Sequence, residues 1–187
     1  RMNTSRSYAP LELDPWDGVL LVDKPPGVTS HDVVAKIRHH FRLKKVGHGG
    51  TLDPLATGLL ILLTGRGTRL SDQIMGSDKT YEGIMQLGVT TDSQDADGAI
   101  IEERPADHIT EEQIRAQMAK RVGDQMQTPP MVSAVKKNRV PHYKLARKGE
   151  TIQREARLIH IYQYQMNAKN GTEVAFTLRC TKGTYVR

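Results

Sequence analysis

One carboxylate in the sequence is surrounded by residue types that would let it act on a substrate. Asp53 lies in the segment GHGGTLDPLATGLL (residues 47–60), which contains four glycines and has Pro54 directly after the aspartate. Glycines remove side-chain bulk and permit close backbone approach, and proline holds the residue before it out of the helical region. A carboxylate held in this way could act as a nucleophile on a sugar or an electrophilic ring. An Asp-Pro pair is also common as a helix N-cap or a turn, so both interpretations stay open.

The chemistry open to Asp53 depends on its partners. Glycoside hydrolysis usually needs a second carboxylate nearby, and the segment around Asp53 offers none, which argues against hydrolysis. An arginine within hydrogen-bond reach would keep the carboxylate ionised and aim it. Arg187 is the candidate, because an extended chain places it on the same face as Tyr185 and Gly183.

Several other kinds of site are excluded by residue spacing. The seven histidines and one cysteine show no zinc-like arrangement, so no metal site is predicted. The glycine-rich stretch contains no Gly-Lys-Ser/Thr, so a nucleotide P-loop is not supported. The segment SQDADG has part of a calcium-loop pattern, but Ser93 replaces the first aspartate and Arg104 stands where the bidentate glutamate belongs.

The composition describes one globular domain without a membrane span. The chain has 187 residues, of which 37% are hydrophobic and 26% charged, and it has no apolar run of about 18 residues. The single cysteine, Cys180, excludes an internal disulfide and fits a reducing cytoplasm. Residues 1–17 lack the apolar core of a signal peptide and are expected to form an N-terminal extension.

The positive charge is concentrated in two places. Eight basic and two acidic residues lie in 131–157, so this segment carries the whole net charge of +6. A second basic run, KIRHHFRLKK (residues 36–45), contains no acid, whereas residues 92–107 are acidic. Such segregation indicates a face that binds a polyanion, although a charge run alone is more often a solvated surface.

Hydrophobic periodicity predicts a mixed α/β sheet domain with an inserted basic arm. The expected strands are 18–22 (interpreted as buried), 59–63, 79–87, 157–166 and 173–180. The strand from Lys79 should place Tyr81, Met85 and Leu87 on one face.

Helices are expected at three places. One begins with Ser30 as a plausible N-cap and ends near Phe41, a brief one covers 68–76, and one follows Thr110 as N-cap. Residues 127–150 show little regular pattern and are predicted to be the basic arm. The chain stops at TYVR without a closing turn or cap, which suggests a fragment.

Six segments of the sequence can be compared as an ordered set: DKPPGVTS (23–30), GHGGTLDPLATGLL (47–60), KTYEG (79–83), GVTTDSQDADG (88–98), VSAVKKNRVPHYKLARKGE (132–150) and CTKGTYVR (180–187). In this order they resemble the bacterial TruB family of tRNA pseudouridine synthases. The resemblance covers residues 18–187, and DPLATGLL looks more like the stand-alone bacterial branch than the dyskerin-like relatives that work with guide RNAs. It implies the pseudouridine synthase fold, a mixed and largely antiparallel sheet flanked by helices, with an RNA-gripping thumb insertion at about 127–156.

The resemblance also implies roles for individual residues. Asp53 matches the family's catalytic nucleophile, Arg187 the arginine paired with it, and Tyr185 the tyrosine beside it. Tyr81 matches the tyrosine that stacks on the target base and is implicated in proton removal, and His48 a histidine associated with opening the RNA loop. Further contacts to substrate RNA are expected from Lys24, Gly50, Thr51, Lys79, Lys136, Lys137, Arg139, Tyr143, Arg147 and Lys182.

The function implied by the resemblance is the isomerisation of uridine 55, in the T loop of tRNA, to pseudouridine. No metal or organic cofactor is expected, nor a guide RNA, and the enzyme is expected to be a cytoplasmic monomer. The base must be flipped out of the folded loop to be reached. The sequence leaves open whether Asp53 attacks C1′ of the ribose, attacks C6 of the base, or removes a proton to give a glycal.

The sequence departs from the family pattern in two ways. Gly49-Gly50 stands where many members have Thr-Gly or Ser-Gly. The family continues past TYVR with the rest of the catalytic domain and usually with a small C-terminal RNA-binding domain, and both are missing here. A catalytically silent RNA-binding or RNA-folding fragment is therefore the alternative from another class, and a nucleoside hydrolase or glycosidase is the third interpretation.

Overall fold

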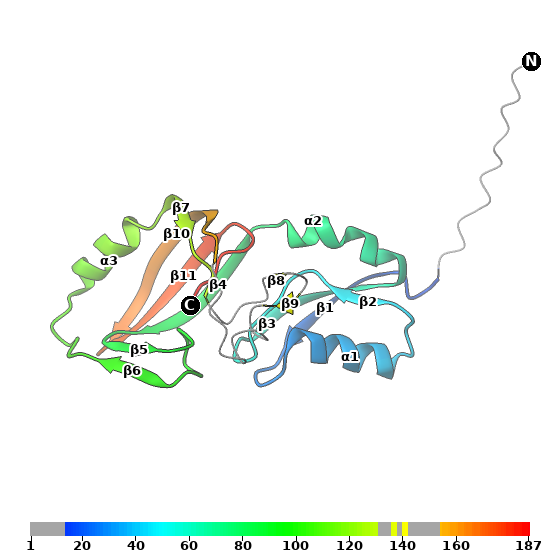
Figure 1. Ribbon diagram of the computed structural model, residues 1–187, viewed down its shortest axis with the longest axis horizontal. Helices are drawn as coiled ribbons and strands as arrows, with labels where there is room; N and C mark the ends of the chain where they lie inside the picture. The colour runs from blue at the N-terminus through cyan, green and yellow to red at the C-terminus, as the bar shows by residue number, and fades with distance from the viewer. Residues whose placement is uncertain (1–13, 131–135, 138–139, 142–153) are drawn as a thin grey trace, which may run out of the picture. The chain divides into compact units, whose positions relative to one another are not determined.

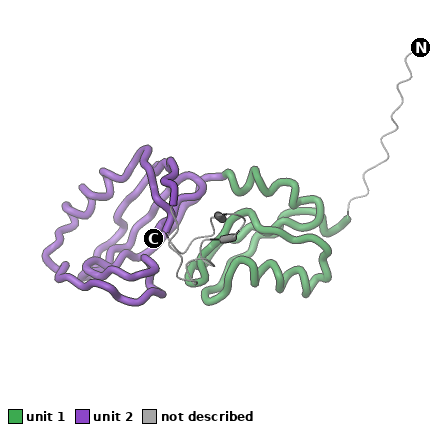
Figure 2. Tube along the Cα trace, in the orientation of Figure 1, with its two compact units in different colours: residues 1–76 green, residues 77–187 purple. Residues whose placement is uncertain are grey.

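The structure is a computed structural model that describes residues 14–130, 136–137, 140–141 and 154–187. The chain divides into two compact units, residues 1–76 and 77–187, which are described one at a time (Figure 2). The expected boundaries of the catalytic domain and of the thumb insertion stay predictions.

The first unit is a three-stranded antiparallel sheet with one helix packed on it (Figure 1). The sheet has the order β1 (Gly18–Lys24), β3 (Gly58–Thr64), β2 (Val46–His48). Helix α1 (Ser30–His40) places Val33 and Val34 against Leu60 and Leu62 of β3. A 3-10 helix, η1 (Gly65–Leu70), and the short helix α2 (Ser71–Met75) complete this unit.

The N-cap of helix α1 is one residue earlier than expected. Thr29, not Ser30, is the N-cap: its hydroxyl accepts from the Asp32 N–H at 3.0 Å, and the Asp32 carboxylate accepts from the Thr29 N–H at 2.8 Å. This reciprocal arrangement is a capping box. It leaves Ser30 inside the helix and buried, free to bind another loop.

Strand β1 was expected to be buried, and this expectation is wrong for the described part of the unit. Among the described residues β1 pairs only with β3, so it forms an edge of the sheet. Val19 is 49% exposed and Leu21 is 65% exposed. An apolar run of this length does not by itself distinguish a central strand from an edge strand.

The second unit is a four-stranded antiparallel sheet with one helix on one face (Figure 1). The sheet has the order β4 (Lys79–Gln86), β11 (Glu173–Cys180), β10 (Arg157–Asn170), β7 (Gly123–Gln127). Helix α3 (Glu111–Ala119) contributes Ile114 and Met118 to the core. The alternation expected for β4 is confirmed, because Tyr81, Met85 and Leu87 all pack against this core.

Two short antiparallel pairs complete the description. One is β5 (Val89–Thr91) with β6 (Ile100–Glu103), and the other is β8 (Lys136–Lys137) with β9 (Val140–Pro141). Every ladder among the described residues is antiparallel, in agreement with the expected fold. Thr110 caps α3 as expected, with Gln113 completing a capping box. No helix in the described part of the chain is long and apolar enough to cross a membrane.

Candidate active site

Asp53 occupies a turn between two neighbouring strands of the first unit. The segment from Gly49 to Thr57 joins β2 to β3, and the Asp53 carbonyl accepts from the Ala56 N–H at 3.0 Å. Pro54 stands at the second position of this turn, where its fixed φ is favourable. Of the two structural interpretations, the turn is therefore correct, and no helix begins at Asp53.

The turn that carries Asp53 is held from both sides, by Lys24 at the end of β1 and by Ser30 at the start of α1. The Lys24 side chain is fully buried, and its ammonium donates to the carbonyls of Pro25 at 2.9 Å, Val28 at 2.8 Å and Pro54 at 3.1 Å. The Gly27 N–H also donates to Pro54, at 2.9 Å. These bonds anchor Pro54, the residue directly after Asp53.

The second clamp is the hydroxyl of Ser30. It accepts from the Leu52 N–H at 2.9 Å and donates to the Leu52 carbonyl at 3.3 Å. Bonds of this kind fix the backbone on the N-terminal side of Asp53, as Lys24 fixes it on the C-terminal side. Together they give the backbone at Asp53 a defined position, which helps to place a reacting group.

Lys24 therefore has a different role from the one expected. Lys24 was expected to contact RNA, but an ammonium has three N–H donors and Lys24 uses them on three backbone carbonyls without exposing any surface. A phosphate would have no donor left to bind. We assign Lys24 to positioning of the Asp53 turn.

Replacing Lys24 by methionine is expected to destabilise the protein by about 2–4 kcal/mol, because three buried carbonyls lose their donor at once. Urea unfolding followed by circular dichroism measures this. Lys36→Met is the matched control: Lys36 is an exposed lysine of α1, and its replacement should change stability by no more than about 0.5 kcal/mol. Equal stabilities of the two variants would contradict the positioning role.

Gly49 is a glycine for a packing reason, which could not be predicted from the sequence. A β-carbon at this position would come within 2.3 Å of Cγ2 of Ile74 in α2. Packing against Ile74 within the first unit therefore accounts for the missing side chain at Gly49, and close approach of a substrate to the Asp53 segment stays a prediction. Gly58 has a φ of +106°, which a residue with a side chain rarely adopts.

His48 lies at the end of β2 and is half-buried. Its Nδ1 atom is buried and has no hydrogen-bond partner in the described part of the chain. Gly50 is half-buried and Thr51 exposed, and both follow His48 on the way to the Asp53 turn. Their expected contacts with RNA stay predictions.

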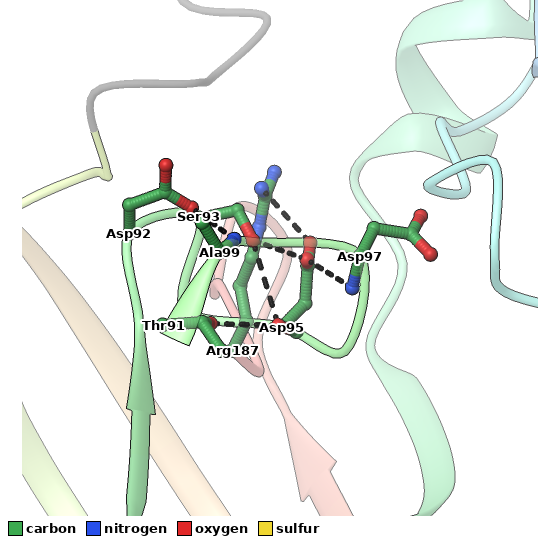
Figure 3. Close-up of polar contacts among 7 residues, drawn as sticks. All are labelled: Thr91, Asp92, Ser93, Asp95, Asp97, Ala99 and Arg187. Atoms are coloured by element: carbon green, nitrogen blue, oxygen red, sulfur yellow. Dashed lines mark hydrogen bonds and ion pairs between the residues drawn. The ribbon is translucent and has the colours of Figure 1, made fainter. Parts of the chain in front are cut away.

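In the second unit, Arg187 is paired with a carboxylate that the sequence analysis did not assign. The Arg187 Nη1 atom lies 3.4 Å from Oδ2 of Asp95, and the two side chains are only 12% and 14% exposed (Figure 3). An ion pair with so little exposure is screened less than a surface pair. Asp95 thereby fixes the direction of the guanidinium.

The loop that presents Asp95 is cross-linked within itself (Figure 3). The Asp95 carboxylate accepts from the Ser93 hydroxyl and from the Asp97 N–H, and the Asp95 carbonyl accepts from the Thr91 hydroxyl at 2.7 Å. Asp92 closes the base of the loop by accepting from the Ala99 N–H at 2.9 Å. The acidic segment that was rejected as a calcium loop is therefore a support for Arg187.

Tyr185 is held by its backbone. The Gln127 side chain, at the end of β7, accepts from the Tyr185 N–H at 2.8 Å and donates to the Tyr185 carbonyl at 2.9 Å. This amide replaces the strand partner that the segment after β11 lacks, since a turn at Gly183, with a φ of +75°, takes the chain out of the sheet. Sequence analysis missed Gln127, because nothing local links it to a residue so far along the chain.

The other expected site residues of the second unit are located as follows. Tyr81 is half-buried on the face of β4 that packs on the core, and Lys79 donates to the Ser77 carbonyl at 2.7 Å. Lys182 is exposed. Lys136 and Lys137 form strand β8, whereas Arg139, Tyr143 and Arg147 lie outside the described residues.

The structure thus groups the expected site residues by unit. Gly50, Thr51 and Asp53 lie in the β2–β3 connection of the first unit, and His48 is the last residue of β2 before it. Arg187, Tyr185 and Tyr81 belong to the second unit, where Arg187 is joined to Asp95.

No group of three or more His, Cys, Asp or Glu residues in the described ranges could hold a metal ion. Burial raises the pKa of the Cys180 thiol, which keeps it protonated and weakly nucleophilic.

Comparison with solved structures defines the class of protein. The chain is similar to a chain in the crystal structure of a Cbf5–Nop10–Gar1 complex, with a TM-score of 0.68 and 32% identity, over 91% of this chain and 41% of that chain. It is also similar to an H/ACA RNP bound to a substrate RNA containing 2′-deoxyuridine, with a TM-score of 0.64 and 27% identity, over 94% of this chain and 46% of that one. The fold is that of the pseudouridine synthases.

Comparison of sequences is more specific. Residues 38–186 match the N-terminal domain of the TruB family of pseudouridylate synthases. The tRNA pseudouridine synthase B of Opitutus terrae is 54% identical over 171 residues, which are 91% of this chain and 71% of that protein. The enzyme of the same name from Syntrophotalea carbinolica is 46% identical over 171 residues, which are 91% of this chain and 56% of that protein. The chain belongs to the TruB family.

Proposed function

We propose that this chain isomerises uridine to pseudouridine in tRNA, at uridine 55 of the T loop, with Asp53 as the reacting carboxylate. The observation that carries the proposal is the family match over residues 38–186. That continuous stretch contains Asp53, Tyr81 and Tyr185, and Arg187 directly follows it. The clamped turn around Asp53 and the ion pair that aims Arg187 support these assignments.

The reaction needs little besides these side chains. The N1–C1′ bond breaks, a C5–C1′ bond forms, C5 gives up its proton and N1 gains one, so atoms and charge balance without a co-reactant. Asp53 starts the exchange by attack at C1′ or C6, or by removing a proton to give a glycal. Arg187 would stabilise an ionised carboxylate by a charge-assisted hydrogen bond, with Asp95 holding it in place.

The proposed substrate is the T stem-loop of tRNA. Its target base must be flipped out, at a cost of a few kcal/mol. Tyr81 would stack on the extruded base, a contact worth about 1–3 kcal/mol. Lys136 and Lys137 of β8 belong to the basic arm, which would bind phosphates. The proposal includes action as a monomer, without a guide RNA, and in the cytoplasm.

Replacing Tyr81 by phenylalanine is expected to lower turnover about 100-fold, the usual contribution of one positioned acid or base. The affinity for tRNA should stay within about twofold, since the stacking ring is retained. Single-turnover rates and filter binding measure the two effects. A Tyr81→Phe variant that turned over at the wild-type rate would show that the Tyr81 hydroxyl takes no part in proton transfer.

The activity itself is tested with unmodified tRNA carrying tritium at C5 of uridine. A pseudouridine synthase releases tritium to water, since C5 exchanges its proton for carbon, and it leaves the base attached to the chain. A nucleoside hydrolase would instead release free uracil. An RNA-binding fragment without activity would bind the tRNA and release neither.

A further inference from the structure

We propose that the first unit carries a second RNA-binding surface, separate from the residues assigned to catalysis, at the C-terminal end of α1. It would bind phosphates of the tRNA and stack on an unpaired base. The inference rests on the proposed function only in taking tRNA as the ligand. We define this surface, the α1-end patch, as the following exposed residues: Trp16, Arg38, His40, Phe41, Arg42 and Lys44.

The centre of the patch is a group of exposed aromatic rings. The rings of Trp16 and Phe41 lie 5.1 Å apart at 43°, and Phe41 meets the edge of His40 at 4.7 Å. Trp16 is the single tryptophan of the chain and is 49% exposed, while Phe41 is 38% exposed. Rings held side by side on a surface, among cations, are what unpaired bases stack on.

The end of α1 also holds an arginine in a conformation that favours glycine. The Leu43 N–H bonds to the Arg38 carbonyl at 2.9 Å and the Arg42 N–H to the His39 carbonyl at 3.2 Å, which is the Schellman pattern. Arg42 occupies its left-handed position with a φ of +53°. A side chain there is strained. Local strain of this kind is often kept for function, and an exposed guanidinium held in this position could bind a phosphate.

The charges of the patch are not balanced by nearby acids. Among the described residues, none of the carboxylates is ion-paired with Arg38, Arg42 or Lys44. The helix dipole accounts for a cation in the last turn of α1, but Arg42 and Lys44 lie beyond the helix.

The acids nearest to Trp16 in the chain form no ion pair with the cations of the patch. The Asp17 carboxylate is bound to Arg66 at 2.7 Å, and that of Asp14 accepts from the Trp16 N–H at 2.9 Å. The segment before β1 and the end of α1 lie at the same end of the first unit (Figure 1). An RNA strand satisfies both features of the patch at once, since it supplies phosphates for the cations and bases for the rings. A polyanion without rings, such as polyglutamate, would satisfy only the cations.

The single tryptophan gives a direct readout. Titration of the whole chain with unmodified tRNA should quench the fluorescence of Trp16, and a polyglutamate of equal charge should not. Arg42→Gly should weaken tRNA binding about three- to tenfold and lower the slope of log K against log salt by about one. Because glycine relaxes the left-handed position, the melting temperature should stay the same or rise, so loss of fold would not explain the weaker binding.

Two further variants separate the cations from the rings. Trp16→Ala should weaken binding without changing the salt slope, because it removes no charge. Arg121→Ala is the charge control: Arg121 is an exposed arginine just after α3 in the second unit, and its loss should leave Trp16 quenching unchanged.

Wild-type affinity in both Arg42→Gly and Trp16→Ala would overturn the inference, as would equal quenching by polyglutamate. Neither result would affect the proposed activity, which tritium release from wild-type protein tests by itself. Conversely, a wild-type protein that binds tRNA through the patch but releases no tritium would contradict the proposed function alone.

Discussion

Replacing Asp53 by asparagine is expected to reduce pseudouridine formation by at least about 10⁴-fold and to leave tRNA binding within about twofold. Asparagine matches aspartate in size and keeps the backbone carbonyl that accepts from Ala56. The clamps from Lys24 and Ser30 act on neighbouring residues, so the turn should survive. What is lost is the negative charge that attacks or removes a proton, and the loss of a reacting group costs orders of magnitude in rate.

The effect is measured by single-turnover tritium release together with filter binding. Asp23→Asn is the matched control, since Asp23 is an exposed aspartate of β1 in the same unit. It should leave both the rate and the affinity unchanged. An Asp53→Asn protein that turned over at a rate close to that of this control would exclude Asp53 as the reacting carboxylate.

The second large effect is expected at Asp95, where replacement by asparagine should lower kcat about 100-fold. The substitution removes the charge that faces Arg187 at 3.4 Å with 12% and 14% exposure. Breaking a partly buried pair leaves the guanidinium without that partner, at a cost of about 2–3 kcal/mol, which corresponds to a factor of about 100 in rate if the arginine acts in the transition state.

A double-mutant cycle tests this assignment. If Asp95 acts through Arg187, then adding Asp95→Asn to an Arg187→Lys protein should lower kcat by less than about threefold further, because residues that act as a unit are not additive. Asp92→Asn is the control within the same loop, since Asp92 binds the Ala99 N–H and not Arg187, and asparagine can still accept that bond. Fully additive losses would show that Asp95 acts independently of Arg187.

Local sequence patterns correctly predicted those helix ends, caps and strand faces that are determined by residues a few positions apart. The helix ending near Phe41, the cap at Thr110 and the alternation along the strand of Tyr81 are all found in the structure. These features depend on capping side chains and on periodicity, which act over one or two turns. The strands β2, β5, β6 and β7 were missed, because they are three to five residues long and rich in Gly, Thr, Glu or Gln.

The support of the candidate site could not be predicted from sequence, because three of its central contacts join distant parts of the chain. The Lys24 ammonium reaches Pro54 across 30 positions, and Gln127 holds Tyr185 across 58. Asp95 meets Arg187 across 92 positions. A lysine next to Pro-Pro-Gly looks like a surface residue until the fold buries it. The candidate reacting residue itself was available from its local motif and from the family resemblance.

The measurement that tests the central claim most directly is a uridine-by-uridine map of pseudouridine in unmodified tRNA after incubation with the wild-type chain and with Asp53→Asn. Carbodiimide modification followed by primer extension reports each pseudouridine as a stop. The account predicts one new stop, at uridine 55 of the T loop, with wild-type protein and none with the variant. A stop of equal strength with Asp53→Asn, or no stop with folded wild-type protein that binds the tRNA, would contradict it.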